Sequence, residues 1–459
     1  MKRALAVSSL ALAFAAPAHA GGPSLIIGAA EDTVRAPTLT EAKAQVDLAR
    51  LAGFGALRVT QIWAPGQQRP SATDLAALRN AATATRIDGM RLFVTVMSFG
   101  SRTTPLSDTD RADFAAFAAD LAKAVRPDYL IVGNEPNLNR FWLPQFNPDG
   151  TDAAAPAYEA LLAQTYDAVK AAAPRVLVLG PALSPRGGDD PASTRPTHSP
   201  TVFIRDLGAA YRSSGRTAPL LDGFVIHPYE ENSDVEPVQG LHPDSTTISI
   251  GDYDKLVGLL DEAFGPGMPI YYGEFGVEST IAPAKATLYT GSEPKTIHPV
   301  DPVTQGRYYR EAVQLAFCQP NVRALMLLHT RDEPDLDRWQ SGVFYLDGTA
   351  KPSLQIVRQA IAQTRRGVVA RCPGLKLTPR ARVSPGAGAT LKLTCDIDCV
   401  YSARAGRRTA HGRAVGGVAA TLRFRRLAPG SYVVRLTLAA PLNPGPPRRL
   451  STRLVVESG

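Results

Sequence analysis

The chain has little of what membrane proteins, metalloproteins and disulfide-dense scaffolds need. Its 459 residues include only 4 cysteines and 7 histidines, which is sparse for a disulfide framework or a histidine-rich metal centre. No apolar run reaches the ~20 residues that span a bilayer, and no nucleic-acid-binding motif is present. We therefore expect a globular protein with no metal, no cofactor, no membrane insertion and no nucleic-acid partner.

The first twenty residues have the pattern of a secretory signal peptide. Lys2 and Arg3 precede an apolar run from Ala4 to Ala16, and Ala18-His19-Ala20 is a small-residue cleavage pattern. The apolar run is too short to be a membrane span. We expect residues 1–20 to be removed, so that a secreted, extracellular chain begins near Gly21.

The four cysteines suit an oxidising compartment, where an even number usually means disulfides. Cys395 and Cys399 are spaced for a disulfide that closes a short local loop. The remaining pair, Cys318 and Cys372, would then form a disulfide between the first domain and the start of the second. Four cysteines allow three connectivities, so this pairing is a preference, with zinc ligation as the less favoured alternative.

Charge is distributed unevenly along the chain. From Cys372 to the end there are 15 Lys and Arg against 3 Asp and Glu, a net charge of +12, and since the whole chain carries +8, the remainder carries −4. A basic, arginine-rich tail could attach loosely to acidic cell-surface polymers. An ordinary solvated surface is the alternative.

Residues 21–368 alternate short apolar runs with helical patterns, and we count eight such pairs. Each run is nearly continuous, as a parallel strand covered on both faces requires. The links from strand to helix are long and those from helix to strand are short, which is typical of a (β/α)8 TIM barrel with its site at the carboxyl ends of the strands. The expected strands are Leu25–Ala29, Leu57–Trp63, Leu92–Met97, Tyr129–Gly133, Val176–Gly180, Gly223–His227, Ile270–Glu274 and Ala324–His329.

The tail, residues 369–459, has a different pattern. Short alternating runs are separated by Pro, Gly and Arg, and no helical period is present, which indicates a small all-β, immunoglobulin-like sandwich. The expected strands are Leu375–Leu377, Thr390–Thr394, Ala420–Phe424, Tyr432–Leu438 and Thr452–Val456.

Two carboxylates stand where expected strands end. Glu135 follows the fourth strand in Gly133-Asn134-Glu135-Pro136, and Glu274 ends the seventh in Gly273-Glu274-Phe275-Gly276. A carboxylate that follows a buried apolar strand is costly unless it is paired or functional. Two carboxylates at one barrel mouth are the groups that hydrolysis of a glycosidic bond requires. One acid protonates the leaving oxygen, and a second carboxylate attacks the anomeric carbon.

These two motifs, on the fourth and seventh strands, resemble the signature of clan A retaining glycoside hydrolases, the group that includes families 5 and 39 and the cellulase-type barrels. The resemblance covers the barrel segment and not the tail. It implies a carbohydrate substrate, Glu135 as acid/base, Glu274 as nucleophile, and Asn134 as the residue that holds the sugar 2-hydroxyl.

Further residues at expected strand ends suit a sugar site. Arg58 could pair with the nucleophile, with a purely structural salt bridge as the alternative. His227 resembles the clan's histidine on strand 6, and Tyr229 follows it at a position to bind Glu274 or a sugar. The aromatic platform of family 5 is absent, because His329 ends strand 8. Candidate stacking surfaces, each as consistent with ordinary loop packing, are therefore Trp63, Trp142 and Trp339.

The sequence leaves other functions open. A catalytically silent barrel that binds glycans would not need both glutamates together with Asn134, so we favour the enzyme. A transglycosylase would use the same covalent intermediate as a hydrolase and differ only in its acceptor. The carboxylates Glu230, Glu231, Asp332 and Glu333 are expected on the rim, where they bind hydroxyls or are simply solvated.

Overall fold

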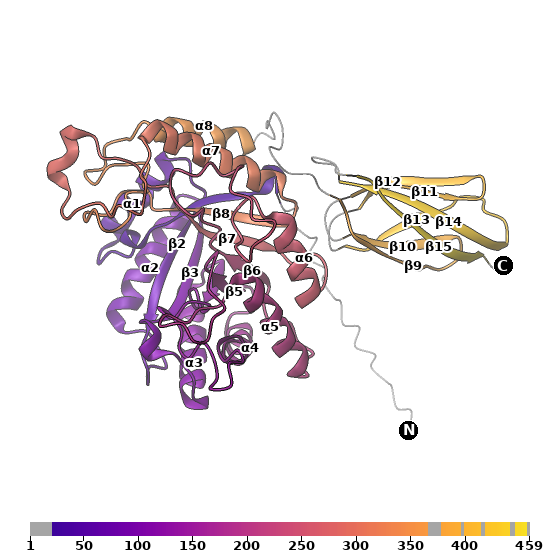
Figure 1. Ribbon diagram of the computed structural model, residues 1–459, viewed down its shortest axis with the longest axis horizontal. Coiled ribbons are helices and arrows are strands. Elements are labelled where there is room, and N and C mark those ends of the chain that lie inside the picture. Colours follow the sequence, from indigo (N-terminus) through magenta and orange to yellow (C-terminus); the bar gives the residue numbers. More distant parts are fainter. Residues whose placement is uncertain (1–20, 366–377, 396–398, 415–417, 441–445, 457–459) are drawn as a thin grey trace, which may run out of the picture.

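The computed structural model describes residues 21–365, 378–395, 399–414, 418–440 and 446–456. It confirms the expected fold class: eight parallel strands close in chain order into a barrel, and two antiparallel sheets follow it (Figure 1). The expected signal peptide and the domain boundary at 368 lie outside the described residues.

The barrel strands lie where the apolar runs predict them. The observed bounds differ from the expected ones by three residues at most, since strand ends depend on pairing rather than on composition alone. The strands are β1 (Ile26–Ala30), β2 (Ala56–Trp63), β3 (Arg91–Ser98), β4 (Tyr129–Val132), β5 (Leu177–Leu183), β6 (Gly223–Ile226), β7 (Ile270–Phe275) and β8 (Val322–Leu328).

Eight helices surround the barrel, and local sequence sets where several of them begin. The Ser71 side chain accepts a hydrogen bond from Asp74 N, which satisfies one of the free N–H groups at the start of the helix. Ser199 and Asp301 cap helices that have proline at the first position, where no backbone N–H is needed. The helices are α1 (Leu39–Leu51), α2 (Ala72–Ile87), α3 (Asp108–Val125), α4 (Ala154–Ala172), α5 (Pro200–Ser213), α6 (Tyr253–Phe264), α7 (Pro302–Cys318) and α8 (Ser353–Arg365).

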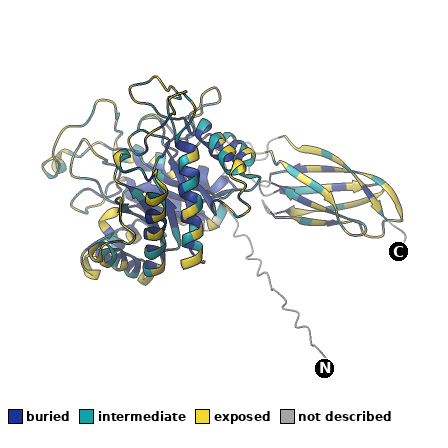
Figure 2. Ribbon diagram, turned by 90° about the horizontal axis from the view of Figure 1, so that it is seen from below, coloured by how far each residue is buried: buried dark blue, intermediate teal, exposed yellow. Residues whose placement is uncertain are grey.

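The barrel core has two layers. Inside the barrel, Phe93 stacks on Tyr129 with ring centroids 4.0 Å apart, and Tyr271 packs against both. A larger apolar layer lies between the strands and the inner faces of the helices, whose outer faces are exposed (Figure 2). Fully burying each large apolar side chain contributes about 1.5–3 kcal/mol, so the barrel is a rigid support for the loops at its mouth.

Side chains in the mouth loops link one loop to the next. Glu31, just after β1, accepts hydrogen bonds from the backbone of Thr330 and Arg331 after β8. Asn137, after β4, donates to Ser184 O and His198 O and accepts from Ser184 N after β5. These contacts fix the loops that carry the candidate site.

The sandwich has a three-stranded sheet, ordered β13-β10-β9, and a four-stranded sheet, ordered β12-β11-β14-β15. The expected strands from Thr390 onward are present, and the one at Leu375–Leu377 lies outside the described residues. Three strands were not expected, among them the mostly exposed β12, whose sequence RTAHGRA has no apolar alternation. The strands are β9 (Ala381–Pro385), β10 (Thr390–Cys395), β11 (Cys399–Ala405), β12 (Arg408–Ala414), β13 (Ala420–Arg423), β14 (Gly430–Ala439) and β15 (Arg448–Val456).

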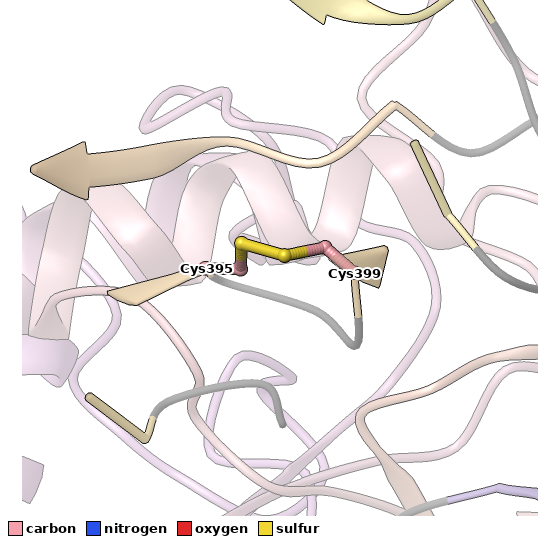
Figure 3. Close-up of a disulfide and its surroundings, with 2 residues drawn as sticks. All are labelled: Cys395 and Cys399. Atoms are coloured by element: carbon pink, nitrogen blue, oxygen red, sulfur yellow. A yellow bond between two sulfur atoms is a disulfide. The ribbon is translucent and has the colours of Figure 1, made fainter. Parts of the chain in front are cut away.

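A disulfide joins Cys395 to Cys399, as the spacing predicts, and connects the end of β10 to the start of β11 (Figure 3). Both cysteines are buried in the sandwich core. Cys318 at the end of α7 is also disulfide-bonded. Cys372, the partner that we expect for it, lies outside the described residues.

Candidate active site

Glu135 lies in a turn directly after β4. Its backbone φ is 43°, in the left-handed region, and its N–H donates to Ala182 O at 2.9 Å. A residue other than glycine in this region costs about 1–3 kcal/mol and persists only where its surroundings impose it, often at functional sites. The turn directs the carboxylate of Glu135 to the mouth of the barrel, where it meets the histidine that directly follows β6.

His227 brings the two candidate catalytic carboxylates together. Its Nδ1 lies 3.1 Å from Glu135 Oε1 and 3.5 Å from Glu274 Oε2. Because both contacts share one nitrogen, the two oxygens are separated by no more than the sum of these contacts, about 6.6 Å. This upper bound on one pair of oxygens allows the ~5–5.5 Å carboxyl spacing of retaining glycosidases.

Arg58 on β2 contacts both halves of the candidate site. Its Nη1 pairs with Glu274 Oε1, and its Nη2 donates to Asn134 Oδ1 at 3.2 Å. Its Nε donates to Thr95 Oγ1 at 2.8 Å, which orients the buried guanidinium. This contact engages the amide oxygen of Asn134 and so fixes the orientation of the amide.

Electrostatics at the site keep Glu274 ionised. Burial acts to raise the pKa of Glu274, but the charges of His227 and Arg58 and the hydrogen bonds from Arg58 and Tyr229 outweigh it, and the pKa falls to about 2. A carboxylate that stays charged in a buried site is suited to nucleophilic attack.

Tyr229 and Trp339 form one wall of the site. The Tyr229 hydroxyl donates to Glu274 Oε2 at 2.9 Å. Its ring stacks on that of Trp339, with centroids 5.3 Å apart and an angle of 30° between the planes. Burial and the charge of Glu274 raise the pKa of Tyr229 well above its ordinary value, so the hydroxyl keeps its proton.

Glycine at position 273 makes room for His227. A Cβ at this position would lie 3.0 Å from His227 Cδ2 and Nε2, and 2.7 Å from Val225 Cγ1. Any larger residue would therefore displace the imidazole that joins the two carboxylates. This close approach explains why the residue before Glu274 has no side chain.

The structure does not place three of the candidate substrate-binding residues against this group. Trp63 is fully buried and packs edge-on against Phe114 of α3. Trp142 is 3% exposed and packs against Tyr158 of α4. Both rings are buried among core side chains, which agrees with the ordinary packing given as the alternative to a stacking surface. His329 follows β8 with φ 66°, and its backbone N–H donates to Ala30 O at 3.1 Å.

Two buried residues near the site, Glu278 and Lys351, are not among those expected from the sequence. Glu278 is 2% exposed and accepts a hydrogen bond from Gln340 N. Asp332, expected on the rim, is instead fully buried and pairs with the equally buried Lys351 at 2.7 Å. The glutamate could have been found from its position four residues after Glu274, whereas the lysine gave no sequence signal.

Within the described part of the chain, no group of three or more His, Cys, Asp or Glu side chains is arranged to hold a metal ion. No helix there has the length and apolar character that crossing a membrane requires.

Comparison with known proteins reveals similarity in structure. No family model and no curated protein matches the chain. A family 39 glycoside hydrolase from the gut symbiont Bacteroides cellulosilyticus WH2 aligns over 95% of this chain and 81% of its own, with 16% identity and a TM-score of 0.53. A glucosidase from Croceicoccus marinus aligns over 96% and 94%, with 11% identity and a TM-score of 0.52. The chain therefore shares its overall fold with these two structures.

Proposed function

We propose that the protein is a secreted retaining glycoside hydrolase that cleaves O-glycosidic bonds of a β-linked poly- or oligosaccharide. One observation carries the proposal: Glu135 and Glu274, from β4 and β7, both contact His227 Nδ1 at the barrel mouth. Paired carboxylates of this kind are the groups that double displacement requires. The similarity in fold to a family 39 enzyme agrees with it.

In the first step, Glu274 attacks the anomeric carbon while Glu135 gives its proton to the glycosidic oxygen. The bond to the leaving group breaks, and an ester forms between the sugar and Glu274. Arg58 and Tyr229 hold the two oxygens of Glu274 before the attack. The amide of Asn134 is oriented by Arg58, and its N–H groups would bind a hydroxyl of the same sugar.

In the second step, Glu135 removes a proton from water, and the hydroxide attacks the anomeric carbon to release Glu274. The sugar leaves with its original anomeric configuration. If a sugar hydroxyl took the place of water, the same residues would perform transglycosylation. Product analysis at high acceptor concentration distinguishes the two reactions.

The main alternative is a catalytically silent barrel that binds glycans. The low pKa of Glu274 argues against it, because binding a neutral sugar does not need a buried carboxylate that Arg58, His227 and Tyr229 together keep ionised. The strained backbone of Glu135 also argues against a silent barrel, because binding a neutral sugar does not require a glutamate in a left-handed turn.

The deciding experiment is hydrolysis of aryl β-glycosides and β-linked polysaccharides by the chain without residues 1–20. We expect turnover that Glu274→Ala abolishes and that added azide partly restores as a glycosyl azide. The matched control is Glu262→Ala on the exposed side of α6. A broad panel without turnover, together with sugar binding by the wild type, would favour the silent barrel.

The basic sandwich supports a second, independent part of the proposal, loose attachment to acidic cell-surface polymers. Arg404 of β11 lies directly opposite Arg435 of β14, and both side chains are exposed. Like charges in opposed positions destabilise a sheet unless an anion offsets them. Salt-sensitive retention of the sandwich on an acidic polysaccharide resin tests this attachment.

A further inference from the structure

A pocket opens beside the candidate catalytic residues. It has a volume of about 230 Å³ and is lined by residues from the loops after β4, β5, β6, β7 and β8, including Glu135, Tyr229 and Trp339. This is roughly the volume of eight water molecules at about 30 Å³ each, enough for one sugar ring. The stacked rings of Tyr229 and Trp339 provide an aromatic wall for the apolar face of that ring.

A buried carboxyl group in this pocket has unused hydrogen-bonding capacity. Glu278 is 2% exposed, and its Oε2 accepts a hydrogen bond from Gln340 N at 3.2 Å. Among the described residues, none contributes a hydrogen bond to Oε1. The backbone N–H of Glu278 donates to Ser233 Oγ at 2.9 Å, so the loops after β6 and β8 both hold this residue in place.

The charges around the pocket disfavour an anionic ligand. The described residues that line it include four glutamates and one arginine. That cation, Arg186, donates from Nη2 to the backbone oxygens of Tyr229 and Glu230. Burial, with the charges of Glu293 and Asp332, raises the pKa of Glu278 to about 8. The surroundings that keep Glu278 protonated would likewise penalise the carboxylate of a uronic acid.

We propose that this pocket binds one uncharged sugar unit, that Glu278 binds a hydroxyl of that sugar, and that uronic acids are excluded. This inference rests on the proposed glycosidase function for its kinetic tests. Its binding test does not depend on turnover.

The first test compares 4-nitrophenyl glycosides that differ only at C6, the β-glucoside with the β-glucuronide and the β-galactoside with the β-galacturonide. In at least one pair, kcat/KM of the uncharged member should exceed that of the uronide by about tenfold or more, equivalent to about 1.4 kcal/mol. A uronide that is turned over equally well or better would overturn the exclusion of acidic sugars.

The second test separates sugar binding by Glu278 from support of the loop. Glu278→Ala should raise KM for the preferred glycoside about tenfold, while Glu278→Gln, which keeps an acceptor for Gln340 N and a donor for the sugar, should stay within about threefold of the wild type. Glu262→Ala is the control for removing an exposed glutamate. A wild-type KM in Glu278→Ala would refute the role of Glu278.

Failure of this inference and failure of the proposed function give different results. If no glycoside is turned over, the Glu274→Ala variant is titrated with glucose, galactose, mannose and glucuronic acid while tryptophan fluorescence is followed. If the Glu274→Ala variant binds an uncharged sugar saturably and the double variant with Glu278→Ala does not, the sugar-binding role of the pocket is supported even if the chain is no enzyme. No binding of any of the three neutral sugars would overturn the inference.

Discussion

Arg58 forms an ion pair with Glu274 across the mouth of the barrel, although 216 residues separate them in sequence. The guanidinium is 3% exposed, so water screens the contact poorly. The same side chain reaches Asn134. One residue of β2 therefore positions a group just after β4 and a group on β7.

Replacing Arg58 should change the pH dependence of catalysis. In Arg58→Met, the pKa of Glu274 rises from about 2 because a cation and a hydrogen-bond donor are lost. The proposed nucleophile Glu274 can attack only above its pKa, so we expect the acidic limb of the kcat/KM profile to move to higher pH and kcat/KM to fall about a hundredfold or more at its optimum. Arg91→Met, at an exposed ion pair on the opposite end of the barrel, is the control. An unmoved acidic limb would contradict this role.

Loss of Glu135 should depend on the leaving group. In Glu135→Ala, 2,4-dinitrophenyl glycosides, whose departure needs little protonation, should form the covalent intermediate at nearly the wild-type rate, whereas alkyl glycosides lose about 100- to 10,000-fold. Rapid-mixing measurement of the dinitrophenolate burst, followed by azide rescue, checks this. Equal losses for both substrate types in a folded variant would show that Glu135 is not the acid.

Substitution of Trp63 should mainly affect stability, whereas substitution of Trp339 should mainly affect KM. Trp63→Ala removes a fully buried ring that packs on Phe114 and should lower the free energy of unfolding by about 3–5 kcal/mol, with KM unchanged. Trp339→Ala removes a wall of the pocket and should raise KM with a smaller loss of stability. Urea unfolding and steady-state kinetics on the two variants give the comparison. An altered KM in Trp63→Ala would reopen its assignment to the core.

Glu230 should make the folded state less stable as pH rises. Burial, and then the charges of Glu231 and Asp252, raise its pKa to about 9, whereas the unfolded chain releases this proton at about 4.3. Between these values unfolding releases a proton, so the free energy of unfolding falls as pH increases. Glu230→Gln should show a flatter dependence from pH 5 to 9, measured by urea unfolding, and Glu262→Gln should behave like the wild type. Parallel curves for Glu230→Gln and the wild type would exclude the effect.

The sequence predicts the barrel well for a physical reason. Parallel strands covered on both faces must be apolar throughout, so each of the eight strands is a nearly continuous apolar run in the sequence, and the loops contain no such runs. The exposed strand β12 has no such requirement, because only one of its seven residues is buried, and it was not expected. The pattern of apolar residues in the sequence therefore indicates which strands are buried, and not which segments have a high strand propensity.

Trp63 and Glu278 show which parts of the site the sequence can predict and which it cannot. Alternate residues of a strand face opposite sides, and Trp63 is an odd number of residues beyond Arg58. If Arg58 faces the barrel mouth, Trp63 must therefore face the helices, so its burial was available from the sequence. The environment of Glu278 was not, because its partners Ser233 and Gln340 come from long loops without periodicity.

The left-handed backbone at Glu135 has a consequence for the evolution of this chain. Glycine adopts that conformation without strain, so Glu135→Gly should raise the thermal midpoint of unfolding while it removes the acid. Differential scanning calorimetry of the two proteins tests this, and a lower midpoint in the variant would disprove it. Selection for stability alone would thus favour loss of the glutamate. Under the proposed function, the glutamate is kept in this strained turn because the acid is needed there, at a cost in stability.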